Sequence, residues 1–316
     1  MGIRVIRKVL GAAFAFAISI TAAPPIRVML LDGEQAGAYH AWQETTPYLK
    51  RMLEDGDMFH VDIVTAPPAD GDFSRFKPDW AKYQVIVSNY DAPDERWPDS
   101  LKASFEQYIR NGGGLVPVHA ADNAFPKWRE FNLMIGVGGW RGRNEKSGPH
   151  FYYQGGKLVS DPAPGLAGSH GARNPFRVVN RVTDHPITAG LPKEWMHTGD
   201  ELYANLRGPG ENMTILSTAY SDPANRGTGH DEPILIVIAY GKGRIFHTVM
   251  GHDLAALNCV GFITTYQRGT EWAATGKVTQ KVPVDFPSAD KTSTRRTYDP
   301  PPGWTSPGGR PHPKSN

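Results

Sequence analysis

Two patterns of apolar positions alternate along the first half of the chain. Short apolar runs typical of strands are separated by stretches in which apolar residues recur at helical spacing. The strand-like runs span residues 25–33, 59–68, 83–91 and 115–118, and the helix-like stretches span 45–59 and 99–114. Strands with apolar centres that alternate with helices are typical of a parallel sheet covered by helices. The pattern therefore predicts an α/β fold.

The pattern changes after residue 135. Residues 136–210 are rich in Gly, Pro, Trp and His and show no helical periodicity, which predicts an insertion of loops and strands. Regular apolar runs return at 213–219 and 233–253, and a helix is expected around 254–275. Within the second run, the sequence YGKG joins two apolar stretches and predicts a hairpin.

The N-terminus has the layout of a secretory signal peptide. Basic residues are followed by an apolar stretch at 9–20, and the small residues of 21–23 come next. We therefore predict a signal peptide at 1–23 and an extracytoplasmic protein, periplasmic or secreted; a retained membrane anchor is the alternative. No other stretch approaches the length of a membrane span.

The C-terminal segment differs in composition from the rest. Residues 277–316 hold eight prolines and few apolar side chains, which predicts a disordered tail. A tail that attaches the protein to a surface or a partner is the alternative. The predicted folded domain is therefore 24–276.

Charge and cysteine content exclude some functions. Removal of residues 1–23 takes away three basic groups and no acidic group, so the net charge changes from +2 to −1. A nearly neutral protein offers no charge-based reason to expect a nucleic-acid partner. Cys259 is the only cysteine and has apolar neighbours, so we interpret it as a buried small side chain rather than a nucleophile.

Several polar residues follow predicted strands, where α/β sheets bind ligands at the carboxyl ends of the strands. His119 follows the run Leu115–Val118, and His252 follows a strand that Gly251 ends. Each imidazole is a candidate for a pocket, and for His119 a satisfied core histidine is the alternative. Asp32 and Asp91 lie at comparable positions.

Two further clusters carry candidate chemistry. Adjacent carboxylates point in different directions, so one of Asp200 and Glu201 is expected to reach a pocket as a general base or metal ligand, unless both lie on the surface. His40 and Trp42 lie between the first strand and the first helix, where Trp42 suits either sugar stacking or core packing. The chain contains no established metal-binding spacing and no serine-hydrolase motif.

Six stretches of the chain resemble the ThuA-like family, named after a trehalose-utilisation protein. They are YHAW (39–42), GGGLVPVHAADNAFPKW (112–128), IGVGGW (135–140), SHGARNPFRVVNRVTDHPITAGLP (169–192), WMHTGDELYANLRGP (195–209) and AYGKGRIFHTVMGHD (239–253). The resemblance implies the fold of class I glutamine amidotransferases, a doubly wound, mostly parallel, flavodoxin-like sheet, here with a loop-rich β insertion. The amidotransferases carry a nucleophilic cysteine where this chain has His119, so glutaminase activity is not expected.

The resemblance also implies a pocket and a substrate class. The pocket would be lined by His40, His119, His170, Asp200, Glu201 and His252, and the substrate would be a small carbohydrate, specifically an oxidised (3-keto) glycoside. We expect His119, Glu201 and His252 to act as acids and bases in elimination or hydrolysis, with His40, Trp42, Asp200 and His170 in substrate binding. His119, His252 and Glu201 could instead hold a divalent metal. The alternatives are a sugar-binding or scaffold module without catalysis and a structural protein attached through its tail.

Overall fold

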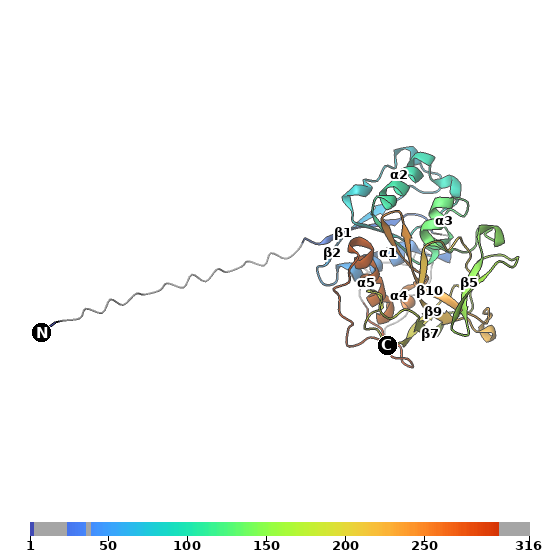
Figure 1. Ribbon diagram of the computed structural model, residues 1–316. Helices are drawn as coiled ribbons and strands as arrows, with labels where there is room; N and C mark the ends of the chain where they lie inside the picture. Colours follow the sequence, from blue (N-terminus) through green and yellow to red (C-terminus); the bar gives the residue numbers. More distant parts are fainter. Residues whose placement is uncertain (3–23, 36–38, 297–316) are drawn as a thin grey trace, which may run out of the picture.

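The computed structural model describes residues 1–2, 24–35 and 39–296 (Figure 1). The predicted signal peptide lies almost entirely outside these residues. In the part of the chain that the structure describes, no helix combines the length and the apolar character that crossing a membrane requires.

One mixed sheet organises the protein. Its parallel part has the order β2-β1-β3-β4-β11. These strands are β1 (Ile26–Asp32), β2 (Phe59–Thr65), β3 (Val85–Ser88), β4 (Gly114–Pro117) and β11 (Gly243–Thr248). The apolar runs that predict strands in the first half of the chain thus form neighbouring strands, because each is buried at its centre.

The sheet continues from β11 with antiparallel strands, in the order β10-β9-β7-β8. These are β7 (Asn174–Asn180), β8 (Glu194–Asp200), β9 (Met213–Tyr220) and β10 (Asp231–Tyr240). The predicted hairpin is confirmed, since β10 and β11 pair on either side of Gly241 and Lys242. The sheet is therefore mixed rather than mostly parallel.

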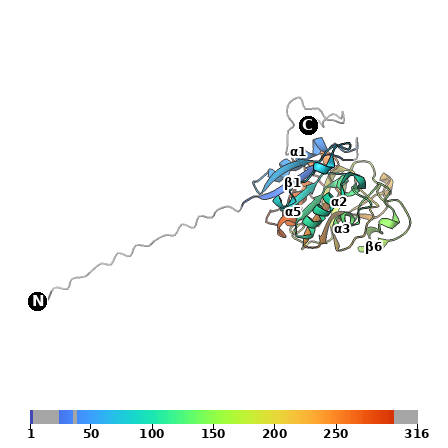
Figure 2. The same ribbon diagram turned by 90° about the horizontal axis from the view of Figure 1, so that it is seen from above.

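The predicted insertion adds a further hairpin to this sheet. It consists of β5 (His150–Gln154) and β6 (Lys157–Asp161), and β5 also contacts β10. Both views place this hairpin at the side of the molecule away from β1 and β2 (Figure 1 and Figure 2).

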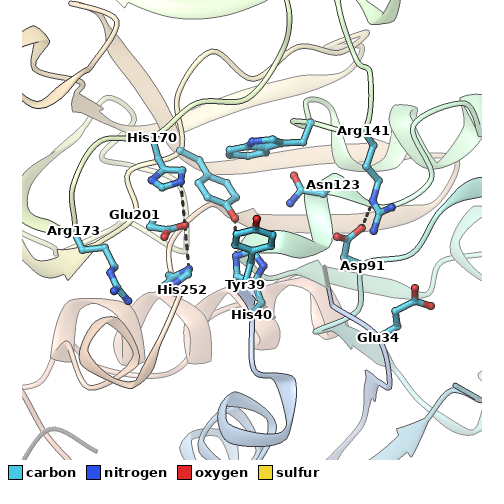
Figure 3. Close-up of a pocket in the computed structure, with 12 residues that line it drawn as sticks. Glu34, Tyr39, His40, Asp91, Asn123, Arg141, His170, Arg173, Glu201 and His252 are labelled. Atoms are coloured by element: carbon cyan, nitrogen blue, oxygen red, sulfur yellow. Dashed lines mark hydrogen bonds and ion pairs between the residues drawn. The ribbon is translucent and has the colours of Figure 1, made fainter. Parts of the chain in front are cut away.

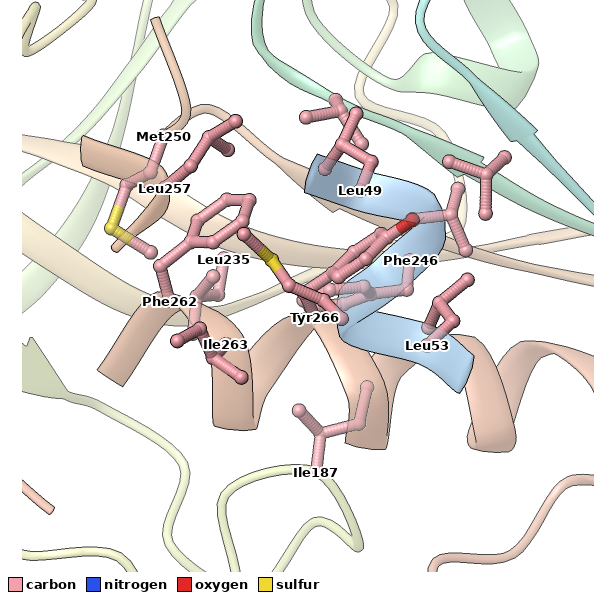
Figure 4. Packing of buried hydrophobic residues seen from close by; sticks show 14 of the residues in the cluster. Leu49, Leu53, Ile187, Leu235, Phe246, Met250, Leu257, Phe262, Ile263 and Tyr266 are labelled. Carbon is pink, nitrogen blue, oxygen red and sulfur yellow. The ribbon is translucent and has the colours of Figure 1, made fainter. Parts of the chain in front are cut away.

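Two groups of helices cover the two faces of the sheet. The helices are α1 (Trp42–Glu54), α2 (Asp99–Arg110), α3 (Arg129–Ile135), α4 (Leu254–Leu257) and α5 (Val260–Thr275). Successive side chains of β1 point to opposite faces. Leu30 therefore packs in the core with α1 and α5, and Leu31 packs with α2 and α3. Figure 4 shows the first of these cores, where Leu49 and Leu53 of α1 face Tyr266 of α5.

The segment after α5 is ordered up to residue 296, contrary to the predicted disordered tail. Its backbone bonds the domain at three places: the N–H of Val260 donates to Ser293, that of Arg295 to Asn258, and that of Met196 to Ser288. A proline-rich segment has too few apolar residues to form a core of its own, but it can adopt a fixed structure by packing against the surface of the domain. The folded unit therefore extends beyond residue 276, and residues 297–316 lie outside the described part.

Candidate functional site

A pocket of about 870 Å³ opens at the carboxyl ends of the parallel strands (Figure 3). It is lined by Glu34, Tyr39, His40, Asp91, Asn123, Trp140, Arg141, His170, Arg173, Glu201, Tyr203 and His252. Segments that follow β1, β3, β4, β8 and β11 supply most of these residues. The pocket thus lies where open α/β sheets bind ligands.

Glu201, which directly follows β8, is the centre of a cluster of imidazoles on the pocket floor. Its Oε2 lies 3.1 Å from Nδ1 of His252, 3.8 Å from Nε2 of His170 and 3.9 Å from Nε2 of His119. Burial raises the pKa of Glu201, but the hydrogen bond from His252 and the neighbouring imidazoles outweigh this, so the pKa falls below its ordinary value. The carboxylate is therefore ionised at neutral pH.

His119 is held in one tautomer at the corner after β4. Its Nδ1 lies 2.7 Å from the carbonyl oxygen of Val249, which can only accept, so Nδ1 carries a proton and Nε2 faces Glu201. Burial, together with the neighbouring His40 and His252, keeps the pKa of His119 well below its usual value despite the hydrogen bond to Val249. His119 is therefore a neutral imidazole.

The backbone of His119 adopts the left-handed conformation, with φ of 47°. A non-glycine residue in this region costs about 1 to 3 kcal/mol, and such residues concentrate at functional sites. Residues 119–123 form a short 3-10 helix. The strained backbone of His119 thus occurs at a residue whose side chain points toward Glu201.

His40 and Tyr203 close the cluster from the other side. The Tyr203 hydroxyl is hydrogen-bonded to Nε2 of His40 at 2.9 Å, and the ring of Tyr203 lies 3.9 Å from that of His119, centroid to centroid. Burial and then the nearby carboxylates Asp122 and Glu201 raise the pKa of Tyr203 well above its ordinary value. Tyr203 is thus a neutral phenol that orients two imidazoles.

Asp200 does not line the pocket, although it was expected to bind substrate. Its buried carboxylate accepts hydrogen bonds from the backbone N–H groups of Glu201, Gly251 and His252 and lies 2.9 Å from Nε2 of His197. Asp200 therefore connects the end of β8 to the loop after β11. It holds the backbone of two cluster residues instead of facing a ligand.

Trp42 also does not line the pocket. It is the first residue of α1 and its side chain is half-buried. Two other aromatic residues take its expected place. Tyr39 is 76% exposed at the pocket, and Trp140 lies 4.4 Å from Tyr203, centroid to centroid. Both lie in stretches that resemble the family, YHAW and IGVGGW, which was the signal available for finding them.

The opposite wall of the pocket carries an ion pair that the sequence did not predict. Nε of Arg141 lies 2.8 Å from Oδ1 of Asp91, and Asn123 and Glu34 lie beside this pair (Figure 3). Burial raises the pKa of Asp91 to about 6 even though Arg141 opposes the shift. Only Asp91 was noticed in the sequence, through its place at a strand end. This wall presents hydrogen-bonding groups to a ligand.

The site contains no cysteine. Cys259 is fully buried and does not line the pocket, in agreement with the interpretation as a core side chain. Within the described residues, His40, His119, Glu201 and His252 form the group with metal-ligating potential, since each offers one ligand atom and all four atoms lie within 4.8 Å of one another.

Comparison with known proteins identifies the family. The ThuA family, described as trehalose utilisation, matches residues 27–273. The solved structure of a ThuA-like protein from Parabacteroides merdae is 46% identical, with a TM-score of 0.83, and the match covers 87% of this chain and 99% of that one. A ThuA-like protein from Bacteroides uniformis is 20% identical, with a TM-score of 0.54 and coverage of 83% and 97%. No curated protein matches significantly. The chain therefore belongs to the ThuA family.

Proposed function

We propose that this protein is an exported enzyme of carbohydrate metabolism that cleaves an oxidised (3-keto) glycoside. The observation that carries the proposal is an ionised carboxylate, Glu201, surrounded by imidazoles on the floor of an open pocket. Such an arrangement suits proton transfer to and from a bound substrate. Export rests on the sequence of residues 1–23, and the strand order β2-β1-β3-β4-β11 supports a doubly wound, flavodoxin-like origin of the parallel half.

The shape and lining of the pocket support a sugar as substrate. Tyr39 and Trp140 offer aromatic surfaces of the kind on which sugar rings stack. Asp91, Asn123 and Arg141 offer hydrogen-bonding groups for hydroxyls on the opposite wall. A volume of about 870 Å³ exceeds what one sugar ring fills. These features favour a glycoside with a second group beyond the reacting ring.

The reaction begins with the ketone at C3, which acidifies the hydrogen on C2. Glu201 removes this hydrogen as a proton, and the electron pair left on C2 forms a double bond to C1 while the bond from C1 to the glycosidic oxygen breaks. The contacts of Glu201 with the three imidazoles all involve Oε2, so Oε1 is the oxygen we assign as base.

The leaving oxygen needs a proton, and His170 is placed to supply it. Its side chain is 35% exposed, whereas those of His119 and His252 are 2% and 4% exposed. His170 lines the pocket, and its Nε2 lies 3.8 Å from Glu201. Elimination thus gives an unsaturated keto sugar and a free alcohol, and addition of water to the double bond then completes a net hydrolysis.

Replacement of Glu201 tests this function. In Glu201→Gln, turnover of 3-keto disaccharides should fall by about 10²- to 10⁴-fold, the usual contribution of a positioned acid or base. Mass spectrometry would follow loss of the keto-glycoside and, in deuterium oxide, exchange of the C2 hydrogen. Glu194→Gln is the matched control, because Glu194 begins the strand that precedes Glu201, is half-buried beside Arg177 and lies outside the pocket.

Two outcomes would count against the proposal. A folded Glu201→Gln variant that converts keto-glycosides at the normal rate would remove Glu201 from the mechanism. A native protein that neither converts any keto-glycoside nor exchanges its C2 hydrogen, yet gains thermal stability from the sugar, would be a sugar-binding module.

A further inference from the structure

We propose that His40, His119, His252 and Glu201 form a binding site for one divalent transition-metal ion. The four residues come from three loops at the carboxyl ends of β1, β4 and β11 and from the end of β8. The family resemblance named His119, His252 and Glu201 as possible metal ligands, and the structure adds His40, which lies 212 positions from His252. The binding claim is independent of the proposed function, whereas the role of the metal in the reaction rests on it.

The distances suit a metal ion. Bonds of about 2.0–2.1 Å in a tetrahedral site place the ligand atoms about 3.4 Å from one another. Oε2 of Glu201 lies 3.1 Å from Nδ1 of His252 and 3.9 Å from Nε2 of His119. All four ligand atoms lie within 4.8 Å of one another. Side-chain shifts of about 1 Å would therefore complete the coordination.

His119 has the bonding pattern of a metal-ligating imidazole. Its Nδ1 donates to the carbonyl of Val249, which leaves the lone pair of Nε2 directed at the cluster. Nε2 is buried and makes no hydrogen bond in the structure. A polar atom in this condition costs free energy unless a partner is added. A bound cation would satisfy it.

The surrounding residues hold the cluster in the way that outer partners hold metal ligands. Metal-binding histidines usually direct their second nitrogen at a carbonyl, carboxylate or hydroxyl group. Val249 serves His119 in this way, and the Tyr203 hydroxyl serves His40. Asp200 fixes the backbone N–H groups of Glu201 and His252. The site is therefore organised before the ion arrives.

The ligand types define the class of metal. Three imidazole nitrogens and one carboxylate oxygen suit Zn²⁺ and neighbouring first-row ions, whereas Mg²⁺ and Ca²⁺ prefer oxygen ligands. Glu201 would coordinate through Oε2 and keep Oε1 toward the pocket. The ion would act as a Lewis acid toward the ketone oxygen of the substrate by taking that oxygen as a fifth ligand. This assignment leaves His170, outside the set, as the proton donor.

Metal binding is testable without any substrate. The purified protein would be stripped with a chelator and titrated with Zn²⁺ against a chromogenic competitor, and bound metal would be counted by mass spectrometry. We expect one Zn²⁺ per chain and at least about a 100-fold loss of affinity in His119→Ala, larger than the 10- to 100-fold expected for an outer partner. Mg²⁺ should not compete. His60→Ala is the matched control, because His60 is exposed on β2, outside the cluster.

A second readout keeps the proposal falsifiable should His119→Ala fail to fold. The visible spectrum of the Co²⁺-loaded protein should change in Glu201→Gln and stay the same in Glu194→Gln. Failure of the stripped, folded native protein to take up Zn²⁺, or His119→Ala binding Zn²⁺ as tightly as the native protein, would overturn the site.

Turnover separates the metal site from the proposed function. Zn²⁺ uptake without keto-glycoside conversion would support the site and reject the function. Conversion by the fully stripped protein, with no uptake, would do the reverse.

Discussion

At this site, the burial and the hydrogen-bond partners of a side chain depend on its neighbours more than on its residue type. Eleven histidines are present, and among those that the structure describes, His40, His119, His170 and His252 lie around Glu201. Asp200 and Glu201 are adjacent in sequence, yet one is fully buried among backbone N–H groups and the other reaches the pocket. Of the two adjacent carboxylates, one thus holds the backbone of the site and the other faces the pocket.

Asp200→Ala should be one of the most destabilising single substitutions in the protein. It would leave the buried N–H groups of Gly251 and His252 and the imidazole of His197 without their acceptor. Breaking a buried pair of this kind costs about 3–5 kcal/mol. Urea denaturation would measure the loss, and Asp253→Ala, which removes the N-cap of α4 and a partly exposed ion pair with Arg173, should cost about 1–2 kcal/mol. Equal losses in the two variants would contradict this interpretation.

Asp91 should make stability depend on pH. Its pKa is about 6 in the folded protein and close to the ordinary 3.8 when unfolded, so the folded state binds a proton more strongly. Stability should therefore fall as pH rises from about 4 to 6, by at most about 3 kcal/mol at 1.36 kcal/mol per pKa unit. Urea denaturation at a series of pH values would show this contribution missing in Asp91→Asn.

Asp62 supplies a control of opposite sign. Hydrogen bonds and charges from Lys82, Tyr83 and Arg27 outweigh burial and lower its pKa to about 2. Its contribution is present above pH 3.8 and is lost as pH falls toward 2. In Asp62→Asn the fall in stability between pH 4 and 6 should therefore persist. If that fall disappeared there and remained in Asp91→Asn, the assignment would be wrong.

At the scale of elements, the sequence predicts best what is local. The strands at 25–33, 59–68 and 115–118 and the helix at 99–114 were predicted close to their observed bounds, because apolar periodicity depends on neighbouring residues. The order of β7, β8 and β9 could not be predicted, because antiparallel partners in a long insertion are set by distant contacts. For the same reason the sequence alone gave candidate site residues but did not show that they lie close together. That expectation came from the family resemblance.

The segment after α5 was predicted to be disordered, because its composition does not show that it packs against the surface of the domain. We expect a chain that ends at residue 276 to be less stable than one that ends at 296. The shorter chain loses the contact of Phe286 with Trp195, 5.5 Å between centroids, and the hydrogen bonds to 258, 260 and 196. Full burial of a Phe side chain contributes about 1.5–3 kcal/mol, and the half-buried Phe286 contributes a part of this. Thermal denaturation of the two chains would measure the difference, and equal midpoints would show that the segment does not stabilise the domain.

Considered as a whole, the molecule forms its site from both halves of one sheet. The parallel half delivers His40, His119 and His252 from its carboxyl ends, and the antiparallel half delivers Glu201. The sequence predicted the parallel half and predicted that ligands bind at the carboxyl ends of its strands. The antiparallel half is what distinguishes this pocket from a bare α/β sheet, since it brings the only carboxylate of the cluster.

The position of β8 at the edge of the sheet path has a consequence for maturation. Glu201 directly follows β8, and β8, which pairs with β7, is the last strand on that side of the sheet. An ion or ligand bound between Glu201 and His40 would join parts of the chain 161 residues apart. Its binding would stabilise only molecules in which β8 is in place, so occupancy of the site would report a completed fold.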